Sequence, residues 1–228
     1  MVRNNLKSDL SDEQRFAGYP IGDKHWEIVK GAASLFIRKG YLNTGVREIA
    51  EASGITVGTL YHYFKSKDEI IKAFLDYAVA GTNEFVRETT KVLLHMEPEA
   101  ALRRAIELYI DYVNEAQNIV LFWHQETRNL IAEQRQRLLD NEAVLAQLFE
   151  NLVERGQKAG IFKMEDAKLA AHNIIVMGDM WAFRRWWLGR RYTSDQYIHK
   201  QTEFIFQGLR NGKSVRQAGK PGEVRARK

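Results

Sequence analysis

Apolar residues recur at helical spacing along nearly the whole chain, and this periodicity constrains the fold more than any other feature of the sequence. Trp26, Val29, Ala33, Phe36 and Ile37, for example, fall on one face of a predicted helix. Alternation of the kind that marks β-strands is rare, and only 3 prolines interrupt the 228 residues. The sequence therefore predicts an all-α fold with about nine helices.

Capping signals give the bounds of these helices. Gly40 and Gly160 are expected to end two of them, and Ser66 with Glu69 forms an S-x-x-E capping box that opens a long helix at Lys67. The predicted helices span residues 26–40, 46–52, 56–64, 67–94, 98–115, 119–131, 133–158, 166–188 and 193–209. The two ends, 1–20 and 211–228, are polar and unpatterned, so we expect a flexible arm and a flexible tail there.

The distribution of charge says little about partners by itself. The formal net charge is +5, and the tail from Asn211 to Lys228 carries six Lys or Arg against one Glu, which accounts for all of it. The rest of the chain sums to zero. Any argument for a nucleic-acid partner therefore depends on where individual residues lie.

Several classes of protein are disfavoured. The chain has no cysteine, so disulfides, thiolate metal sites and a Cys nucleophile are absent, and a reducing cytoplasm is the predicted location. The sequence contains no run of about 18 apolar residues, so no membrane span is expected, and the N-terminus lacks the apolar segment of a secretory signal. The motifs H-E-x-x-H, G-x-S-x-G and the phosphate-binding Gly loop are also missing. We therefore predict no catalytic residue, no metal and no cofactor.

The stretch "TVGTLYHYFKSK", residues 56–67, indicates a function. It follows a short predicted helix and a tight turn, where Gly54 favours a positive φ. Ala50 is small where a second helix must cross, and Ile55 and Leu60 can pack the two helices together. This is the spacing of a helix-turn-helix, whose second helix enters the major groove of DNA.

The predicted second helix and its flanks carry threonine hydroxyls, a glycine, aromatic rings with polar groups and lysines. Gly58 permits close approach to the groove floor, Val57 can meet a thymine methyl, and the threonines can hydrogen-bond base edges or phosphate. Thr44 is also predicted to cap the first short helix. The predicted DNA-binding residues are Thr44, Arg47, Thr56, Val57, Gly58, Thr59, Tyr61, His62, Lys65 and Lys67.

Residues 24–77 resemble the N-terminal domain of the TetR family of transcriptional regulators. The resemblance lies in "AASLFIRKGYLNTGVREIAEASGITVGTLYHYFKSKDEIIKAF", which has the family's motifs in order and at the usual spacing. One departure is Gly45, where the family often has Ser or Thr. The resemblance implies a helix-turn-helix domain over 21–70 and a helical effector-binding and dimerisation domain over 71–210. The rest of the chain is similar to the family in architecture only.

The family resemblance also implies a homodimer on a palindromic operator. The last two long helices, about 142–159 and 167–188, are expected to pair with their symmetry mates. Small and apolar residues form one stripe on each, and the alternative that these stripes face their own core stays open. The predicted dimer residues are Val144, Leu148, Leu152, Gly156, Ile174, Gly178, Trp181 and Arg185.

An aromatic-rich region of the second half is the predicted effector pocket, although core packing is an open alternative for each ring. Its predicted lining is Tyr109, Tyr112, Phe122, Trp123, His124, Arg128, Met177 and Trp181. The chain is loosely similar to members that sense acyl-CoA thioesters, with Arg103, Arg104 or Arg128 as phosphate contacts. The expected function is a repressor released by its effector. Alternatives are an activator, or an enzyme or scaffold with a vestigial DNA-binding half.

Overall fold

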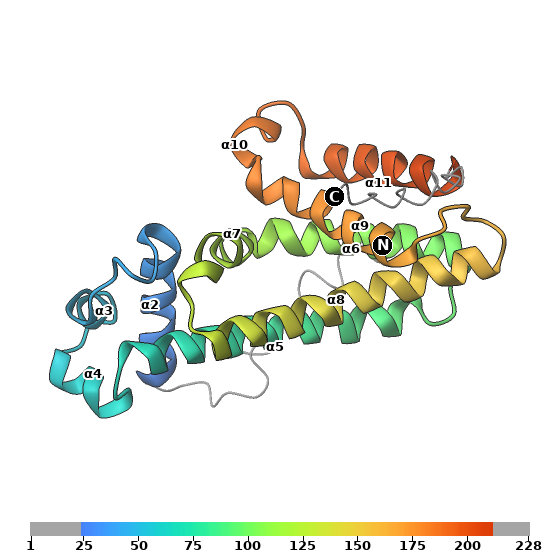
Figure 1. Ribbon diagram of the computed structural model, residues 1–228. Coiled ribbons are helices and arrows are strands. Elements are labelled where there is room, and N and C mark those ends of the chain that lie inside the picture. The colour runs from blue at the N-terminus through green and yellow to red at the C-terminus, as the bar shows by residue number, and fades with distance from the viewer. Residues whose placement is uncertain (1–23, 212–228) are drawn as a thin grey trace, which may run out of the picture.

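The computed structural model describes residues 24–211 and confirms an all-α fold over them (Figure 1). This part of the chain forms ten α-helices and one short 3-10 helix. They are α2 (Lys24–Lys39), α3 (Val46–Ala52), α4 (Val57–Tyr63), α5 (Lys67–Leu93), α6 (Pro98–Glu115), α7 (Gln117–Glu126), η2 (Thr127–Asn129), α8 (Ala132–Lys158), α9 (Ala167–Phe183), α10 (Arg185–Leu188) and α11 (Ser194–Asn211). Among the described helices, none has the length and apolar character needed to cross a membrane. The predicted arm 1–20 and tail 211–228 lie outside the described residues, apart from Asn211.

The capping signals are present in the structure. Gly40, Gly54 and Gly160 take positive φ values of 86°, 65° and 72°, which end or turn the chain at the expected places. The hydroxyl of Ser66 accepts a hydrogen bond from the amide of Glu69 at 3.2 Å and so caps α5.

Two predicted helices are shorter than expected. The helix predicted over 166–188 breaks at Arg184, whose φ and ψ of −114° and 20° separate α9 from the four-residue α10. The helix predicted over 119–131 begins at Gln117 and ends at Glu126, where the 3-10 turn follows. Neither break coincides with a glycine or a proline, so local sequence signals do not mark them.

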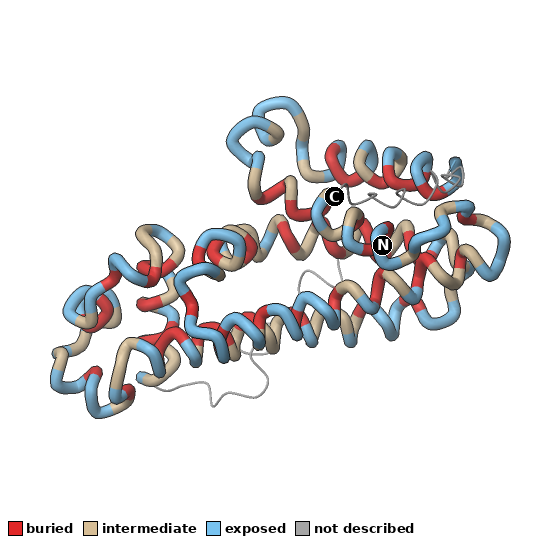
Figure 2. Tube along the Cα trace, in the orientation of Figure 1, coloured by how far each residue is buried: buried red, intermediate tan, exposed pale blue. Residues whose placement is uncertain are grey.

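Helices α2, α3, α4 and the start of α5 pack around one core, which we call the head. Ile28, Phe36, Ile49, Leu60 and Phe74 are at most 1% exposed within it. The buried positions of these helices appear in Figure 2 as red bands that face inward. This core fixes the angle between α3 and α4.

Helices α5, α6, α8, α9 and α11 form the larger part of the fold, which we call the body. Its core contains Tyr109, Phe149, Trp181 and Phe206, all almost fully buried. Helix α5 runs unbroken from the head into the body alongside α8 (Figure 1). Helix α5 therefore belongs to both the head and the body.

Candidate functional site

Helix α4 is attached to the head by one face and exposes the other. Leu60 is fully buried, whereas Thr56, Gly58, Thr59 and Tyr61 are exposed. Thr56 caps the helix, because its hydroxyl accepts from the amide of Thr59 at 3.1 Å. The exposed face therefore carries two hydroxyls, a bare glycine and a ring that is 51% exposed.

Gly58 makes no close packing contact with the residues that the structure describes. A Cβ built at this position would meet only the hydroxyl oxygen of Thr56, at an ordinary 3.8 Å. Its φ does not lie in the left-handed region either. Since glycine inside a helix is unfavourable by roughly 1 kcal/mol relative to alanine, the fold itself gives no reason for its presence. A side chain could therefore be accommodated at this position among the described residues.

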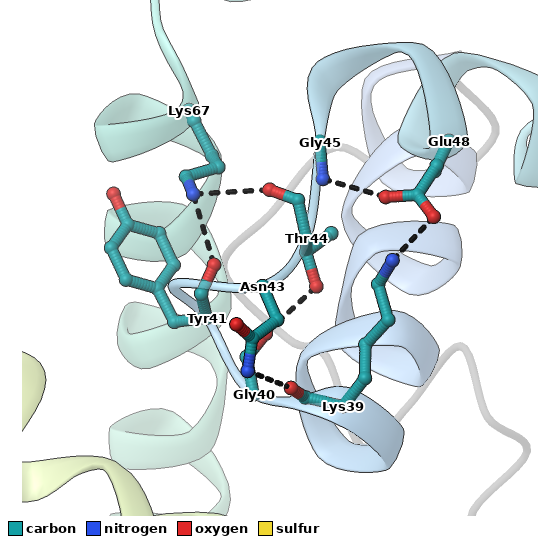
Figure 3. Close-up of polar contacts among 8 residues, drawn as sticks. All are labelled: Lys39, Gly40, Tyr41, Asn43, Thr44, Gly45, Glu48 and Lys67. Atoms are coloured by element: carbon teal, nitrogen blue, oxygen red, sulfur yellow. Dashed lines mark hydrogen bonds and ion pairs between the residues drawn. The ribbon is translucent and has the colours of Figure 1, made fainter.

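The turn between α2 and α3 is held by Lys67 and Thr44 (Figure 3). The Lys67 ammonium donates to the carbonyl oxygens of Tyr41 at 2.9 Å and of Thr44 at 3.0 Å. The Thr44 hydroxyl donates to the Gly40 carbonyl at 2.8 Å, and the residue is 2% exposed. This corrects the predicted phosphate contact of the Thr44 side chain, which is buried. Lys67 uses two of its three N–H groups to hold the turn, and its phosphate contact stays a prediction.

The structure also corrects the predicted cap of α3, which is Gly45 and not Thr44. Gly45 has no side chain to serve as a cap, so the carboxylate of Glu48 reaches back and accepts from its amide at 2.8 Å (Figure 3). The Lys39 ammonium pairs with the same carboxylate and, together with this amide, lowers the pKa of Glu48. Arg47, Lys65 and His62 are exposed around this scaffold, as a DNA contact requires.

A cluster of polar side chains lies inside the body. The Tyr109 hydroxyl donates to Asp179 at 2.6 Å, and the His124 ring nitrogen Nε2 lies 3.4 Å from the second oxygen of that carboxylate. Burial and the Asp179 charge raise the pKa of Tyr109, and the hydrogen bond to Asp179 raises the pKa of His124. Asp179 is 5% exposed, whereas the His124 side chain is 44% exposed. The cluster thus connects the interior to the surface at His124.

A second polar group lies in the body between α5, α6 and α8. The Asn141 amide donates to the Thr82 hydroxyl at 3.1 Å, and this hydroxyl lies 3.4 Å from that of Tyr112. The side-chain oxygen of Asn141 is buried and has no hydrogen-bond partner among the described residues. A buried acceptor without a donor is unfavourable by about 1–3 kcal/mol, so this atom is a candidate contact for a ligand N–H or O–H.

The other predicted effector residues lie elsewhere. Phe122 is 1% exposed and packs against Phe36 and Phe74, so it belongs to the core of the head. Trp181 stacks on Tyr197 and donates to Asn114, which makes it part of the packed body. These positions correct the prediction for both residues.

The remaining predicted effector residues also lie away from the polar clusters. Trp123 packs against the core of the head, Arg128 is exposed on η2, and Met177 lines a groove between α9 and α11. Arg103 and Arg104, expected near phosphates, are already paired with Glu203 and Glu107.

Most of the predicted dimer stripe is buried within a single protomer. Leu148, Leu152 and Ile174 are at most 8% exposed. A Cβ on Gly156 would lie 2.1 Å from the Phe162 ring, and one on Gly178 would lie 2.6 Å from Tyr109. These glycines allow close packing inside the body, as the alternative of an internal core contact had it. The interface prediction is corrected for Leu148, Leu152, Gly156, Gly178 and the buried Trp181. Val144 and Arg185 remain exposed.

A groove of about 320 Å³ lies on the outer surface of α9 and α11. Its lining is mainly apolar: Met164, Ala170, Asn173, Ile174, Met177, Phe204, Ile205, Gln207, Gly208 and Leu209. Phe204 is 60% exposed, and Leu169 and Val176 on α9 are 52% and 39% exposed. A Cβ on Gly208 would meet nothing within 4 Å. This surface is open and apolar, and Ile174 is the predicted dimer residue that lies in its lining.

Helix α7 connects the body to the head, a contact that the sequence did not indicate. Its last residue, Glu126, accepts from the Tyr41 amide at 3.3 Å and from the Asn129 side chain at 3.1 Å. Glu126 is 9% exposed and lies against Gly40. Two residues earlier, His124 contacts Asp179 in the body. One short helix therefore touches both the polar cluster and the turn that carries α3.

Comparison with known families covers most of the described chain. A family model described as bacterial regulatory proteins, tetR family, matches residues 28–74. A second, described as a tetracyclin repressor-like C-terminal domain, matches residues 95–209, which is half of the chain. The first match covers the head and the second covers most of the body.

Individual relatives agree with this result. The chain is 28% identical over 190 residues to the transcriptional repressor KstR2 of Rhodococcus jostii, which covers 80% of this chain and 89% of the relative. It is similar in structure to AibR solved with isovaleryl coenzyme A and operator DNA, at a TM-score of 0.69 and 21% identity over 81% of this chain and 98% of the other. FadR of Bacillus subtilis, solved with stearoyl-CoA, has a TM-score of 0.63 at 19% identity over 83% and 99%.

Proposed function

The chain belongs to the TetR family of bacterial regulatory proteins, and from this premise we propose that it is a homodimeric repressor released from its operator by a small effector. Like its relatives, it is a DNA-binding transcriptional regulator and not an enzyme. A protein that binds the bacterial chromosome acts in the cytoplasm, and we propose that location here.

The observation that carries the proposal is the exposed face of α4. Leu60 fixes the helix in the head, while Gly58 leaves its outer surface without a side chain. Such a surface suits contact with the floor of the major groove, with Val57 and Thr59 beside base edges and Arg47 and Lys65 near phosphates. We propose Tyr61 and His62 as further backbone contacts.

The groove on α9 and α11 supports the second element of the proposal, a dimer. Two recognition helices must be held about one turn of DNA apart, which requires a rigid pairing of two copies. Phe204, Leu169 and Val176 offer apolar area that a symmetry mate would cover, and Gly208 leaves room for a close approach. Phe204→Glu is expected to yield monomers in sedimentation, whereas Leu94→Glu, which alters an equally exposed leucine elsewhere, leaves the dimer intact.

The interior polar groups support an effector with an apolar chain and hydrogen-bonding groups. The unpartnered oxygen of Asn141 requires a donor, and Thr82 and Tyr112 lie beside it. An acyl-CoA thioester meets this description, since its pantetheine arm has amide N–H groups and its acyl chain is apolar. We propose that class of effector on this basis and on the similarity to regulators solved with such ligands.

Release requires a route from the body to the head, and two helices provide one. Helix α5 is continuous between them, and α7 contacts Asp179 through His124 and Tyr41 through Glu126. We propose that the effector displaces α7 and α5 together and thereby changes the spacing of the heads. The effector must prefer the released conformation, since equal affinity for both would shift nothing.

A binding assay with matched variants tests the proposal. Purified protein is titrated against DNA from beside its own gene and against random DNA of equal length, with and without acyl-CoA. Thr59→Ala is expected to weaken operator binding more than random binding, because it removes a base contact. The matched control is Thr90→Ala, another exposed threonine, on α5 far from the head. Equal losses on both DNAs would contradict the base-reading role, and transcription assays separate repression from activation.

A further inference from the structure

The segment from Arg184 to Arg191 has an unusual composition, which the proposed function does not explain. It reads RRWWLGRR, with four arginines, two tryptophans and no acidic residue. Trp186 is 63% exposed and Trp187 is 37% exposed. Figure 1 shows its short helix α10 projecting beyond the end of α9. We call residues 184–191 the Arg/Trp segment.

The side chains of the Arg/Trp segment are arranged in pairs. The Arg184 guanidinium lies 5.2 Å from the centroid of the Trp186 ring, and that of Arg191 lies 4.0 Å from Trp187. A guanidinium that stacks on a ring keeps N–H groups at its edge free to donate. No carboxylate of the described residues forms an ion pair with Arg184, Arg190 or Arg191.

This differs from the arginines of α6. Arg103 pairs with Glu203, and Arg104 pairs with Glu107, so their charges are already neutralised by neighbours. Exposed tryptophan rings beside uncompensated guanidinium groups contribute little to the stability of the protomer. They are, however, the groups that recognise an aromatic ring attached to phosphates.

The Arg/Trp segment begins where the polar cluster of the body reaches the surface. Phe183, the last residue of α9, packs edge-on against the His124 ring at 4.5 Å between centroids. His124 is half-exposed and bonds to the buried Asp179. The exposed end of this polar cluster, at His124 and Phe183, therefore lies next to Arg184.

We propose that the Arg/Trp segment binds the nucleotide end of a coenzyme A thioester, an inference that rests on the effector class in the proposed function. Coenzyme A carries an adenine ring, a diphosphate and a 3′-phosphate. The adenine stacks on Trp186, and the phosphates accept hydrogen bonds from Arg184, Arg190 and Arg191. The pantetheine arm then passes His124 toward the interior. Arg185 donates to Asn114 and lies over Trp181, so it anchors the segment to the body.

Calorimetric titration of the full chain without DNA tests this assignment. The ligands are coenzyme A, dephospho-coenzyme A and pantetheine. Arg184→Gln/Arg191→Gln is expected to raise the Kd for coenzyme A at least about tenfold, since two charge-assisted contacts are lost, and to leave the Kd for pantetheine unchanged. Trp186→Leu is expected to raise the Kd for coenzyme A about tenfold, because the stacking of adenine on the indole ring is lost.

A charge-matched control separates specific contacts from general electrostatics. Lys91→Gln/Lys158→Gln also removes two positive charges, from exposed positions outside the segment, and is expected to change the Kd for coenzyme A by less than about twofold. An equal effect of both double variants would overturn the assignment. Equal wild-type affinity for coenzyme A and pantetheine, or no binding of either, would also overturn it.

Two further results separate this assignment from its alternatives. If Trp186→Leu lowers the sedimentation mass while the Kd for coenzyme A is unchanged, the segment is a contact between copies and the assignment is wrong. If acyl-CoA releases operator DNA equally well from Arg184→Gln/Arg191→Gln and from wild type, the nucleotide site fails while the proposed function stands. If wild type binds no operator, the proposed function fails, and the titrations still decide the nucleotide site.

Discussion

Substituting Gly58 with alanine separates the requirements of folding from those of DNA binding. The new methyl group would find only the Thr56 hydroxyl oxygen, at 3.8 Å, and the backbone conformation suits any residue. A glycine-to-alanine change at such a site stabilises a protein by about 0.4–1 kcal/mol. Because Gly58 lies in the first turn of α4, we expect about 0.5 kcal/mol. For a chain of this length the corresponding rise in Tm is about 1–2 °C.

The same methyl group is expected to weaken operator binding. If the backbone of α4 approaches the groove floor at van der Waals distance, an added carbon displaces the helix. Overpacking of this kind is unfavourable by about 1–3 kcal/mol, which corresponds to about a 5- to 150-fold rise in the operator Kd. Random DNA should be affected less, because phosphate contacts dominate nonspecific binding.

Urea unfolding at fixed protein concentration and fluorescence anisotropy with labelled operator measure the two effects. Gly81→Ala is the matched control: it lies in α5, where a Cβ would be 3.7 Å from the Tyr112 hydroxyl. It should raise stability without changing operator affinity in the absence of effector. Wild-type operator affinity in Gly58→Ala would refute the close approach, and a loss of stability would refute the absence of an internal role.

Three further substitutions test the packing of Gly156, the polar cluster at His124 and the coupling between the effector and the head through α7. Gly156→Ala places a methyl 2.1 Å from Phe162 and should lower the free energy of unfolding by about 1–3 kcal/mol while the dimer persists in sedimentation. The pKa of His124 is raised in the folded state, so the contribution of its protonated ring to stability is present at low pH and is lost as the pH rises through that pKa. The loss of unfolding free energy in His124→Asn, measured by urea unfolding, should therefore be larger at pH 5.5 than at pH 8.5. Glu126→Gln should reduce effector-induced release several-fold in anisotropy titrations, and unchanged release would exclude α7 as a route.

Local sequence signals predicted the head well because its geometry is set by neighbouring residues. Gly54 turns the chain between α3 and α4, and Ser66 caps the helix that follows. Leu60 is buried and Gly58 is exposed, as the helical period requires. These features depend on residues within a few positions of one another, so the pattern of the sequence contains them.

Long-range packing could not be predicted in the same way. Gly156 and Gly178 suggested close approach of helices, and the structure shows that the approach is to Phe162 and Tyr109 of the same chain. A small residue indicates that another part of the protein packs closely against the helix, but it does not indicate which element that is. Phe122 looked like part of an effector pocket because of its aromatic neighbours, yet the path of α7 directs it into the head. Helical period alone cannot distinguish these partners.

With the proposed acyl-CoA effector, the position of α7 predicts different roles for the two ends of the ligand. If the Arg/Trp segment keeps the same contacts with the nucleotide when the repressor is bound to its operator and when it is released, those contacts do not distinguish the two states. Equal contacts increase affinity for the effector but cannot drive release. The differential contacts must involve groups that move with α7 or α5, of which His124 and Thr82 are the best placed. Under these two proposals, the nucleotide would set the concentration at which the effector binds, and the pantetheine and acyl portions would determine whether the operator is released.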